Sequence, residues 1–440
     1  MSNIISDLER KYQIELDDVQ KSALSSLIDF ITDERKTLCL SGRAGTGKST
    51  LVKIFKDILD SKHVSYTCLT PTNKSKSIYN DSKVQTIHGF LQLRPEIDIL
   101  DFDATQLTFS FGSRGINRDN ILIVDECSMV NDDLFRILKE RCIKLLAVGD
   151  AQQLAPVKQL SISEIFKSET IYLTNVHRQP DSCIQKVLNY LRKKPLYKFK
   201  SISDEGGSIT IVNNINKMLK DYSYLFKLSD DLQDRTLVKL ITYTNKRIDA
   251  LNQLIRKYLY TTNFEYQIGE ILTGYDTCSC HNECIDNSVD YVVKKVYPEI
   301  IHGMKGYKLL LTSNSREFSV LILSRYNSPE EFKRLTLKLE TLRQKAVKTK
   351  SKALWRQFYC LNDSFLTPVD LVYDNRVIKR KSLDYGYCIS THKSQSSSYS
   401  IVMIDMENLW RCPDKEQLRQ LQYVACSRTM SDLIIYQKDD

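Results

Sequence analysis

The chain has 440 residues, a formal net charge of +9 and 42% hydrophobic residues. At about 150 residues per domain, this length predicts roughly three domains, and 14 Gly with 9 Pro exclude a collagen-like or low-complexity chain. No apolar run approaches the roughly 18 residues of a membrane span, and twelve Cys are too dilute for a disulfide framework. We therefore expect an ordered cytoplasmic protein with reduced thiols, whose modest positive charge permits a nucleic-acid partner.

Short apolar strands alternate with helical patterns over the first 160 residues. The strands are expected at 36–41, 66–69, 121–125 and 145–149. This alternation is typical of a parallel sheet with helices on both faces. Apolar residues at mostly two-residue spacing on either side of 103–106 predict a β-hairpin insertion over 96–113. We therefore expect a first α/β domain at 1–170.

A second α/β pattern starts near Thr174 and resumes close to the end of the chain. Its strands are expected at 237–242, 386–391, 400–405 and 433–436. The sequence between the strands at 237–242 and 386–391 has a β-like and irregular pattern from about residue 267, apart from a basic helical stretch at 330–358. These patterns predict a second α/β domain made of 171–266 and 386–440, with a domain inserted at 267–385.

A phosphate-binding loop is predicted directly after the first strand. Residues 42–49 read GRAGTGKS and fit the eight-residue P-loop pattern between a strand and a helix. Glycines let backbone N–H groups converge on phosphate oxygens, Lys48 reaches the terminal phosphates, and the Ser49 hydroxyl can bind Mg²⁺. The expected nucleotide-binding residues here are Gly42, Ala44, Gly45, Thr46, Gly47, Lys48, Ser49 and Thr50.

Two adjacent carboxylates follow the buried strand at 121–125. Asp125 can hold Mg²⁺, and Glu126 can orient and deprotonate an attacking water. Solvated acids at an ordinary strand end are the alternative, which the nearby P-loop disfavours. Together the two motifs predict hydrolysis of a nucleoside triphosphate.

Further motifs occur in the order found in superfamily-one helicases. They are TPTNK at 70–74, TIH at 86–88, GDAQQLAPV at 149–157, TNK at 244–246, THKSQ at 391–395 and YVACSR at 423–428. The chain resembles the RecD-like branch of these helicases from Leu16 to Tyr436. This resemblance implies two RecA-like P-loop domains with ATP and Mg²⁺ between them, a β-hairpin insertion in the first, and an SH3-like insertion with a helical tower in the second.

The resemblance also implies roles for single residues. Gln20 matches a glutamine that reads adenine, and Gln153 matches one that senses the γ-phosphate. Arg178 and Arg428 match two arginines that reach the γ-phosphate from the second domain, where a permanently charged guanidinium suits developing phosphoryl charge. The implied catalytic set is Lys48, Asp125, Glu126, Gln153, Arg178 and Arg428, with Ser49 and Asp125 on the metal.

A track for single-stranded DNA is implied across both sheet domains. Its residues are Pro71, Thr72, Asn73, Lys74, Thr86, His88, Thr244, Asn245, Thr391, His392 and Lys393. Each of them could instead be a loop residue with a local hydrogen bond. Phe102, beside the predicted hairpin turn, is expected to stack on a base at the fork, or else to pack with Phe109 and Phe111.

Three features depart from the family pattern or stay open. Ser396 stands where the family usually has Gly, and Ser adopts positive φ less readily. Cys278, Cys280, His281 and Cys284 could hold zinc, but their spacing favours a reduced surface loop. The basic helical stretch could guide DNA, or it could be a solvated face.

These observations predict an ATP-dependent DNA helicase that moves on single-stranded DNA, in the 5′ to 3′ direction that the resemblance implies, and unwinds duplex in replication, recombination or repair. The alternatives are a translocase that displaces bound proteins and a non-enzymatic P-loop recruitment module. We expect a monomer with no membrane partner that binds single-stranded and forked DNA, with a single-strand-binding or replisome protein as a candidate partner. If the protein is viral, it is expected in the host cytoplasm.

Overall fold

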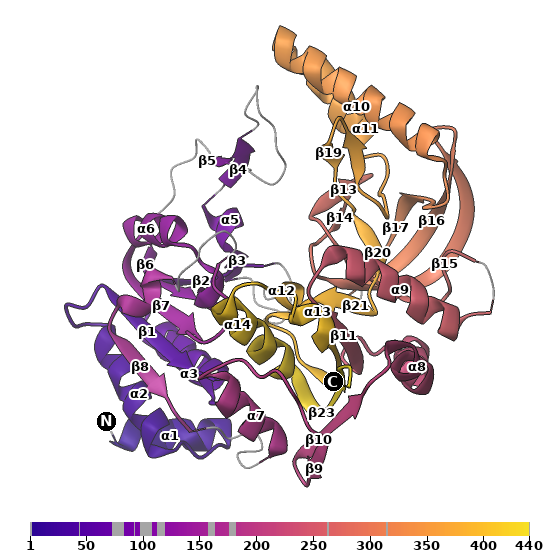
Figure 1. The fold of residues 1–440 in the computed structure, drawn as a ribbon. Helices are drawn as coiled ribbons and strands as arrows, with labels where there is room; N and C mark the ends of the chain where they lie inside the picture. Colours follow the sequence, from indigo (N-terminus) through magenta and orange to yellow (C-terminus); the bar gives the residue numbers. More distant parts are fainter. Residues whose placement is uncertain are drawn as a thin grey trace.

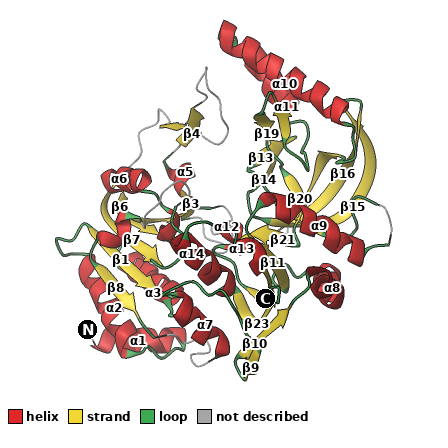
Figure 2. Ribbon diagram, viewed as in Figure 1, coloured by secondary structure: helices red, strands yellow, loops and turns green. Residues whose placement is uncertain are grey.

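The computed structural model describes residues 2–43, 45–72, 83–91, 93–96, 108–111, 119–156, 163–175, 182–261, 264–313 and 316–439. Two α/β units lie next to each other, and an antiparallel sheet carrying a projecting pair of helices extends from the second unit (Figure 1). In each α/β unit the strands lie between helices (Figure 2). In the described part of the chain, no helix combines the length and apolar composition that crossing a bilayer requires.

The first unit is built on a six-stranded sheet with the order β3-β2-β6-β7-β1-β8, in which all neighbours are parallel. Its strands are β1 (Thr37–Gly42), β2 (Tyr66–Thr70), β3 (Val84–Thr86), β6 (Asp119–Val124), β7 (Cys142–Gly149) and β8 (Thr170–Leu173). The helices are α1 (Ser2–Tyr12), α2 (Asp18–Phe30), α3 (Lys48–Ser61), α5 (Ile87–Phe90) and α6 (Asp132–Glu140), with short 3₁₀ turns η1 (Cys127–Met129) and η2 (Glu164–Lys167).

Both faces of this sheet are buried, as its apolar strands predict. Leu38 and Leu40 of β1 pack in one core cluster with α2 and α3. Cys39, which points to the other face, packs with α5 and α6. The parallel sheet covered on both faces is therefore confirmed.

A small antiparallel pair leaves the first unit. β4 (Leu93–Glu96) pairs with β5 (Thr108–Phe111), and Leu93 lies opposite Phe111. The predicted hairpin turn at 103–106 and Phe102 lie outside the described residues. The function of this insertion therefore stays a prediction.

The second unit has the sheet order β21-β11-β22-β23-β10-β9, parallel except for the β9 edge. Its strands are β9 (Ile202–Asp204), β10 (Gly207–Val212), β11 (Val238–Thr242), β21 (Cys388–Ser390), β22 (Tyr399–Asp405) and β23 (Thr429–Tyr436). Its helices are α7 (Cys183–Leu191), α8 (Ile215–Leu232), α9 (Asn245–Leu259), α12 (Thr391–Ser394), α13 (Met406–Leu409) and α14 (Lys415–Cys426). The β9–β10 hairpin was not predicted, because every residue of β9 is exposed and the strand shows no apolar pattern.

Between α9 and β21 in the sequence, the chain forms an antiparallel sheet with the order β17-β16-β15-β12-β20. The elements of this region are β12 (Ile271–Gly274), β13 (Cys278–Cys280), β14 (Glu283–Ile285), β15 (Asp290–Ile301), β16 (Met304–Ser313), β17 (Arg316–Leu323), α10 (Pro329–Thr349), α11 (Lys352–Asn362), β18 (Leu371–Tyr373), β19 (Arg376–Lys379) and β20 (Leu383–Tyr385). Buried ion pairs join it to the second unit, between Arg256 and Glu270 at 2.6 Å and between Lys239 and Asp290 at 3.2 Å. Whether this sheet is SH3-like stays a prediction, as do the domain boundaries.

The basic stretch forms two helices where the sequence predicted one. Lys350 takes a left-handed conformation with φ 51° and ends α10. The Ser351 side chain then accepts a hydrogen bond from the Leu354 backbone N–H and caps α11. The chain therefore turns back, and α11 packs along α10.

The four candidate zinc ligands lie on one tight hairpin, formed by β13 and β14. Cys280 is buried in the core of the inserted sheet, whereas Cys284 is exposed. His281 lies in the turn with φ 49°. No group of three or more metal-ligating side chains gathers among the described residues.

Candidate nucleotide and strand-binding site

The P-loop lies at the carboxyl end of β1, immediately before α3. Gly47 has φ 86°, and a Cβ atom at this position would lie 2.4 Å from Nε2 of Gln20, so the loop requires glycine here. Lys48 begins α3, and its Nζ donates to the carbonyl oxygens of Gly42 at 2.6 Å and Arg43 at 2.8 Å. The ammonium group is therefore held over the loop.

Gln20 lies against the same loop from α2. Its Nε2 donates to the Thr46 carbonyl at 3.1 Å, and its Oε1 accepts from the Asp17 backbone N–H at 3.2 Å. The second bond belongs to a capping box at the start of α2. The structure thus places Gln20 beside the P-loop and also gives it a helix-capping role, which the sequence analysis did not predict.

The two predicted carboxylates follow β6, which is adjacent to β7 in the sheet. Asp125 accepts a hydrogen bond from the Glu126 backbone N–H at 2.9 Å, and Glu126 has a left-handed φ of 52°. Burial, followed by the charge of Asp125, raises the pKa of Glu126, and the charges of Arg428 and Lys48 oppose this shift. A carboxylate with a raised pKa suits a general base.

Lys48 belongs to the same charged cluster. Burial lowers the pKa of its ammonium group, while the carboxylates of Asp150, Glu126 and Asp125 act in the opposite direction. The carboxyl ends of the three neighbouring strands β1, β6 and β7 therefore bring these charges into electrostatic range of one another.

Arg428 brings a positive charge from the second unit. It follows α14, is 5% exposed, and donates to the carbonyl oxygens of Val424 at 3.1 Å and Ser397 at 3.2 Å. Burial lowers its pKa, and Glu126 is the strongest opposing influence. The electrostatic influence of Glu126 on Arg428 therefore acts from one unit to the other.

A buried hydrogen-bond network also joins the two units. Asp150, at the end of β7, accepts a bond from the Tyr423 hydroxyl of α14 at 2.7 Å. Arg192, just after α7, donates to the same hydroxyl at 3.1 Å and reaches Asp150 at 3.5 Å. Nothing in the sequence indicates this role for Tyr423 or Arg192, because no local pattern marks a contact between residues so far apart in the chain.

The segment after Asp150 lies between the units as well. Leu154 packs in the core of the second unit, and the Ala155 backbone N–H donates to Gln420 Oε1 at 3.3 Å. Gln153 is 6% exposed, and its Oε1 has no hydrogen-bond partner among the described residues. A buried amide oxygen without a partner is costly, so it marks a position where a ligand or a conformational change can satisfy it.

These residues fit a nucleoside triphosphate with Mg²⁺. The loop around Gly47 leaves no room for a side chain, Lys48 supplies a positive charge, and Asp125 with the exposed Ser49 supplies hard oxygen ligands. Thr46 is buried, with its hydroxyl bonded to the Arg43 carbonyl at 2.9 Å. Thr50 is half-buried in the first turn of α3, and Gly45 has φ 81° in the loop.

The predicted strand-binding residues that are described follow four strands. Pro71 and Thr72 follow β2, Thr86 and His88 lie at the end of β3 and in α5, Thr244 and Asn245 follow β11, and Thr391, His392 and Lys393 form α12 after β21. Because β2 neighbours β3 and β11 neighbours β21, these residues gather at the carboxyl edge of each sheet. Figure 1 shows α5 and α12 on the side from which β4–β5 and α10 project.

Several of these side chains have local structural bonds. Thr391 is fully buried and donates to the Thr242 carbonyl at 3.2 Å. Thr86 caps α5 by accepting from the Gly89 backbone N–H at 3.1 Å. The Lys393 ammonium donates to the Tyr275 carbonyl at 3.1 Å, which ties α12 to the inserted sheet. Asn245 and His88 are exposed.

More bonds of this kind occur in the second unit. Thr244 donates from its backbone N–H to Asn408 Oδ1 at 2.9 Å, and burial lowers the pKa of His392. Ser396, whose departure from glycine was noted, does adopt the left-handed conformation with φ 61°. Its side chain therefore does not prevent the loop geometry. The predicted site residues Ala44, Asn73, Lys74, Phe102 and Arg178 lie outside the described residues.

Comparison with known proteins gives sequence relatives and a structural neighbour. A family model described as an AAA domain matches residues 15–214. The ATP-dependent DNA helicase Dda of Enterobacteria phage T4 is 26% identical over 274 residues, covering 59% of this chain and 60% of that protein. The ATP-dependent RecD2 DNA helicase of Deinococcus radiodurans is 28% identical over 172 residues, covering 35% of this chain and 21% of its own length. Both alignments thus span less than two thirds of these relatives.

A solved structure extends the comparison to nearly the whole chain. The crystal structure of the Pif1 helicase from Candida albicans covers 97% of this chain and 95% of its own, with a TM-score of 0.50 and 16% identity. At this identity the likeness shows a shared fold, which is the mixed α/β fold with a parallel six-stranded sheet described above.

Proposed function

We propose that this chain is a superfamily-one helicase that hydrolyses ATP to move on single-stranded DNA and unwind duplex DNA. The AAA-domain match over residues 15–214 and the similarity to the Dda and RecD2 helicases support this proposal. One observation carries the proposal. The buried hydrogen bond from Tyr423 of the second unit to Asp150 of the first, at 2.7 Å, holds the helix before Arg428 at the carboxyl edge of the first sheet, where Arg428 acts electrostatically on Glu126. Hydrolysis is thereby linked to the relative position of the two units.

The chain's own residues support a simple division of work in hydrolysis. The P-loop amides and Lys48 would bind the phosphates, and Ser49 with Asp125 would hold Mg²⁺, which would neutralise phosphate charge. Glu126 accepts the proton of the attacking water, since its raised pKa brings it closer to the working pH. Arg428 stabilises the charge that develops on the transferred group, and we assign the same role to Arg178.

Movement along DNA follows from closure of the two units. The predicted DNA-binding residues lie at the carboxyl edges of both sheets. Closing and opening of the units therefore change the distance between two sites that bind the same DNA strand. The 5′ to 3′ direction, the role of Phe102 at the fork and work in the cytoplasm are parts of this proposal that rest on the sequence resemblance. The family relationship leaves the pathway open among replication, recombination and repair.

Lys48→Ala tests the phosphate site. It removes the ammonium group that the loop carbonyls hold and leaves no large cavity, so DNA-stimulated ATP hydrolysis should be lost while the unfolding midpoint stays close to wild type. Lys53→Ala is the matched control, because Lys53 is an exposed lysine of the same helix. Hydrolysis retained in Lys48→Ala, or lost equally in Lys53→Ala, would overturn the assignment.

A translocase that only displaces bound proteins is the second candidate. Both candidates hydrolyse ATP on single-stranded DNA, so the distinction requires a forked duplex without bound protein. Unwinding of such a fork supports a helicase. Hydrolysis without unwinding supports the translocase.

A further inference from the structure

The helices α10 and α11 carry most of the net positive charge of the chain. Residues 329–362 contain nine Lys and Arg against three Glu, so they hold six of the chain's nine net positive charges. Five basic side chains of α10 are exposed, and no ion pair joins them to a carboxylate in the described part of the chain. These five are Lys333, Arg334, Lys338, Lys345 and Lys348.

The glutamates of α10 do not neutralise this surface. Glu331 accepts a bond from the Ser328 backbone N–H at 2.7 Å and completes the helix cap. Glu340 is 3% exposed and accepts two bonds from Arg343, each at 2.9 Å. Glu330 lies in the first turn, where a negative charge interacts favourably with the helix dipole. The outer basic residues therefore face solvent uncompensated.

The buried side of α10 fixes the direction of its basic side. Leu335, Leu339 and other apolar residues pack against Phe358 and Leu361 of α11 and against the inserted sheet. Arg334, Lys338 and Lys345, at positions i, i+4 and i+11, lie on the opposite side of the helix. Fourteen residues at 1.5 Å separate Arg334 from Lys348, a span of about 21 Å. About six phosphates of one DNA strand occupy that length.

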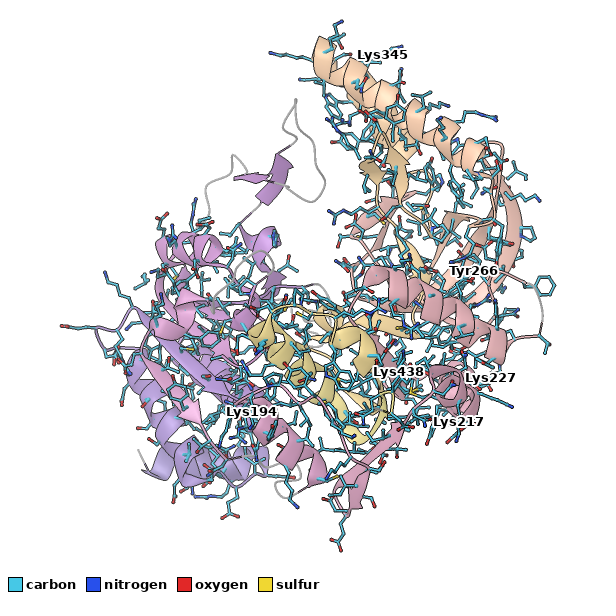
Figure 3. All side chains as sticks on the ribbon, viewed as in Figure 1. Lys194, Lys217, Lys227, Tyr266, Lys345 and Lys438 are labelled. Carbon is cyan, nitrogen blue, oxygen red and sulfur yellow. The ribbon has the colours of Figure 1, made fainter. Side chains whose placement is uncertain are left out.

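The helix α10 projects from the side of the molecule on which the predicted strand track lies. In Figure 1, α10 and the β4–β5 pair project from the same side of the molecule, with α5 at the base of the β4–β5 pair and α12 lower, between the two projections. Figure 3 labels Lys345 near the free end of α10, far from the second sheet. A duplex meeting the strand track from this side would therefore pass within reach of α10.

We propose that the basic face of α10 binds the phosphate backbone of the double-stranded DNA ahead of the fork. This inference rests on the proposed function. Duplex is favoured over single-stranded DNA, because no aromatic side chain of α10 is exposed and single-strand binding depends on stacking of bases on aromatic rings. Lysine and arginine alone are sufficient for phosphate contacts to a duplex.

The test variant is Lys338→Gln/Lys345→Gln/Lys348→Gln, which keeps the helix propensity and removes three charges. The matched control is Lys217→Gln/Lys220→Gln/Lys257→Gln, which removes three exposed charges from α8 and α9. Fluorescence anisotropy compares the affinity of each protein for a single-stranded tail alone and for the same tail joined to a duplex, at several salt concentrations. ATP hydrolysis stimulated by the tail alone, and the unfolding midpoint, are measured on the same preparations.

We expect the variant to bind the tail and hydrolyse ATP as the wild type does, but to lose the affinity that the duplex adds. At about 0.9 ions per phosphate contact, three lost contacts lower the salt slope by roughly 2.7. Between 50 and 200 mM salt, the affinity of the wild type for the tailed duplex should then fall about 40-fold more than that of the variant.

Two results would overturn the proposal: a duplex that adds no affinity to the wild-type protein, or an equal loss in the variant and the control. If the duplex adds no affinity, an acidic protein becomes the expected partner of α10. Failure of the wild-type protein to bind the tail or to hydrolyse ATP with it would instead overturn the proposed function. Lys345→Glu alone, a single surface change, should show the same selective loss if the triple variant is destabilised.

Discussion

Replacing Tyr423 by phenylalanine should weaken the link between the two units without disturbing the core of either unit. The hydroxyl donates to Asp150 at 2.7 Å and accepts from Arg192 at 3.1 Å, so it joins α14 of the second unit to β7 of the first. Tyr423 is 2% exposed and Asp150 is 1% exposed, so water replaces the lost bond poorly. The ring itself remains and keeps its packing.

The magnitude follows from the charge of the acceptor. A hydrogen bond to a charged group contributes about 1.5–3 kcal/mol. The bond joins the two units, so its loss should disfavour the arrangement that the structure shows, called closed below, relative to arrangements in which the units lie farther apart. At 1.4 kcal/mol per factor of ten, the closed population should fall about 10- to 150-fold relative to the open one. DNA-stimulated ATP hydrolysis, which needs Arg428 close to Glu126, should fall with it.

The assay measures kcat for ATP at saturating DNA, together with the unfolding midpoint. Tyr266→Phe is the matched control, because it removes a buried hydroxyl that has no hydrogen-bond partner among the described residues. Asp150→Asn completes a double-mutant cycle with Tyr423→Phe, and the two changes should be coupled by about 1 kcal/mol or more. Wild-type kcat in Tyr423→Phe, or additive effects in the cycle, would refute the coupling role.

Two further substitutions address the chemistry. Glu126→Gln should still bind ATP with Mg²⁺ but hydrolyse it about 10²- to 10⁴-fold more slowly, because the amide cannot accept the proton; loss of nucleotide binding would show a structural role instead. Burial raises the pKa of Glu126, so wild-type hydrolysis should fall on acidification at a higher pH than an ordinary glutamate predicts, and Glu126→Gln should lack this limb of the pH profile. Arg428→Ala should lower kcat about 10³-fold with nucleotide binding largely kept. A marked fall in the unfolding midpoint of this variant would indicate that Arg428 acts mainly by stabilising the fold through its bonds to the Val424 and Ser397 carbonyls.

The sequence was informative wherever function depends on neighbouring residues. The P-loop and the two carboxylates after β6 are read directly from short motifs, because a strand followed by glycines and a lysine has few structural uses. The strands β1, β2, β6, β7, β11, β21, β22 and β23 were predicted to within four residues, since parallel strands covered on both faces are almost wholly apolar. The strands β3, β8, β9 and β10 were not predicted.

Features that depend on distant contacts were not visible. Asp150 and Tyr423 are 273 positions apart, and no periodicity indicates that they meet. The bond from the Lys393 ammonium group to the inserted sheet was not predicted either, and the place of Lys393 on the DNA track stays a prediction. The break at Lys350 was missed because lysine rarely adopts a left-handed conformation.

The inserted sheet has a consequence for how this chain can change over evolutionary time. Its first and last strands, β12 and β20, are antiparallel neighbours, with Gly274 paired to Leu383. Residues paired in this way can be joined by a turn of two to five residues, so everything between them could be exchanged for a short turn without altering the order of the second sheet. The arm that carries α10 can thus vary in length and sequence, while the strands of the second sheet keep their connections.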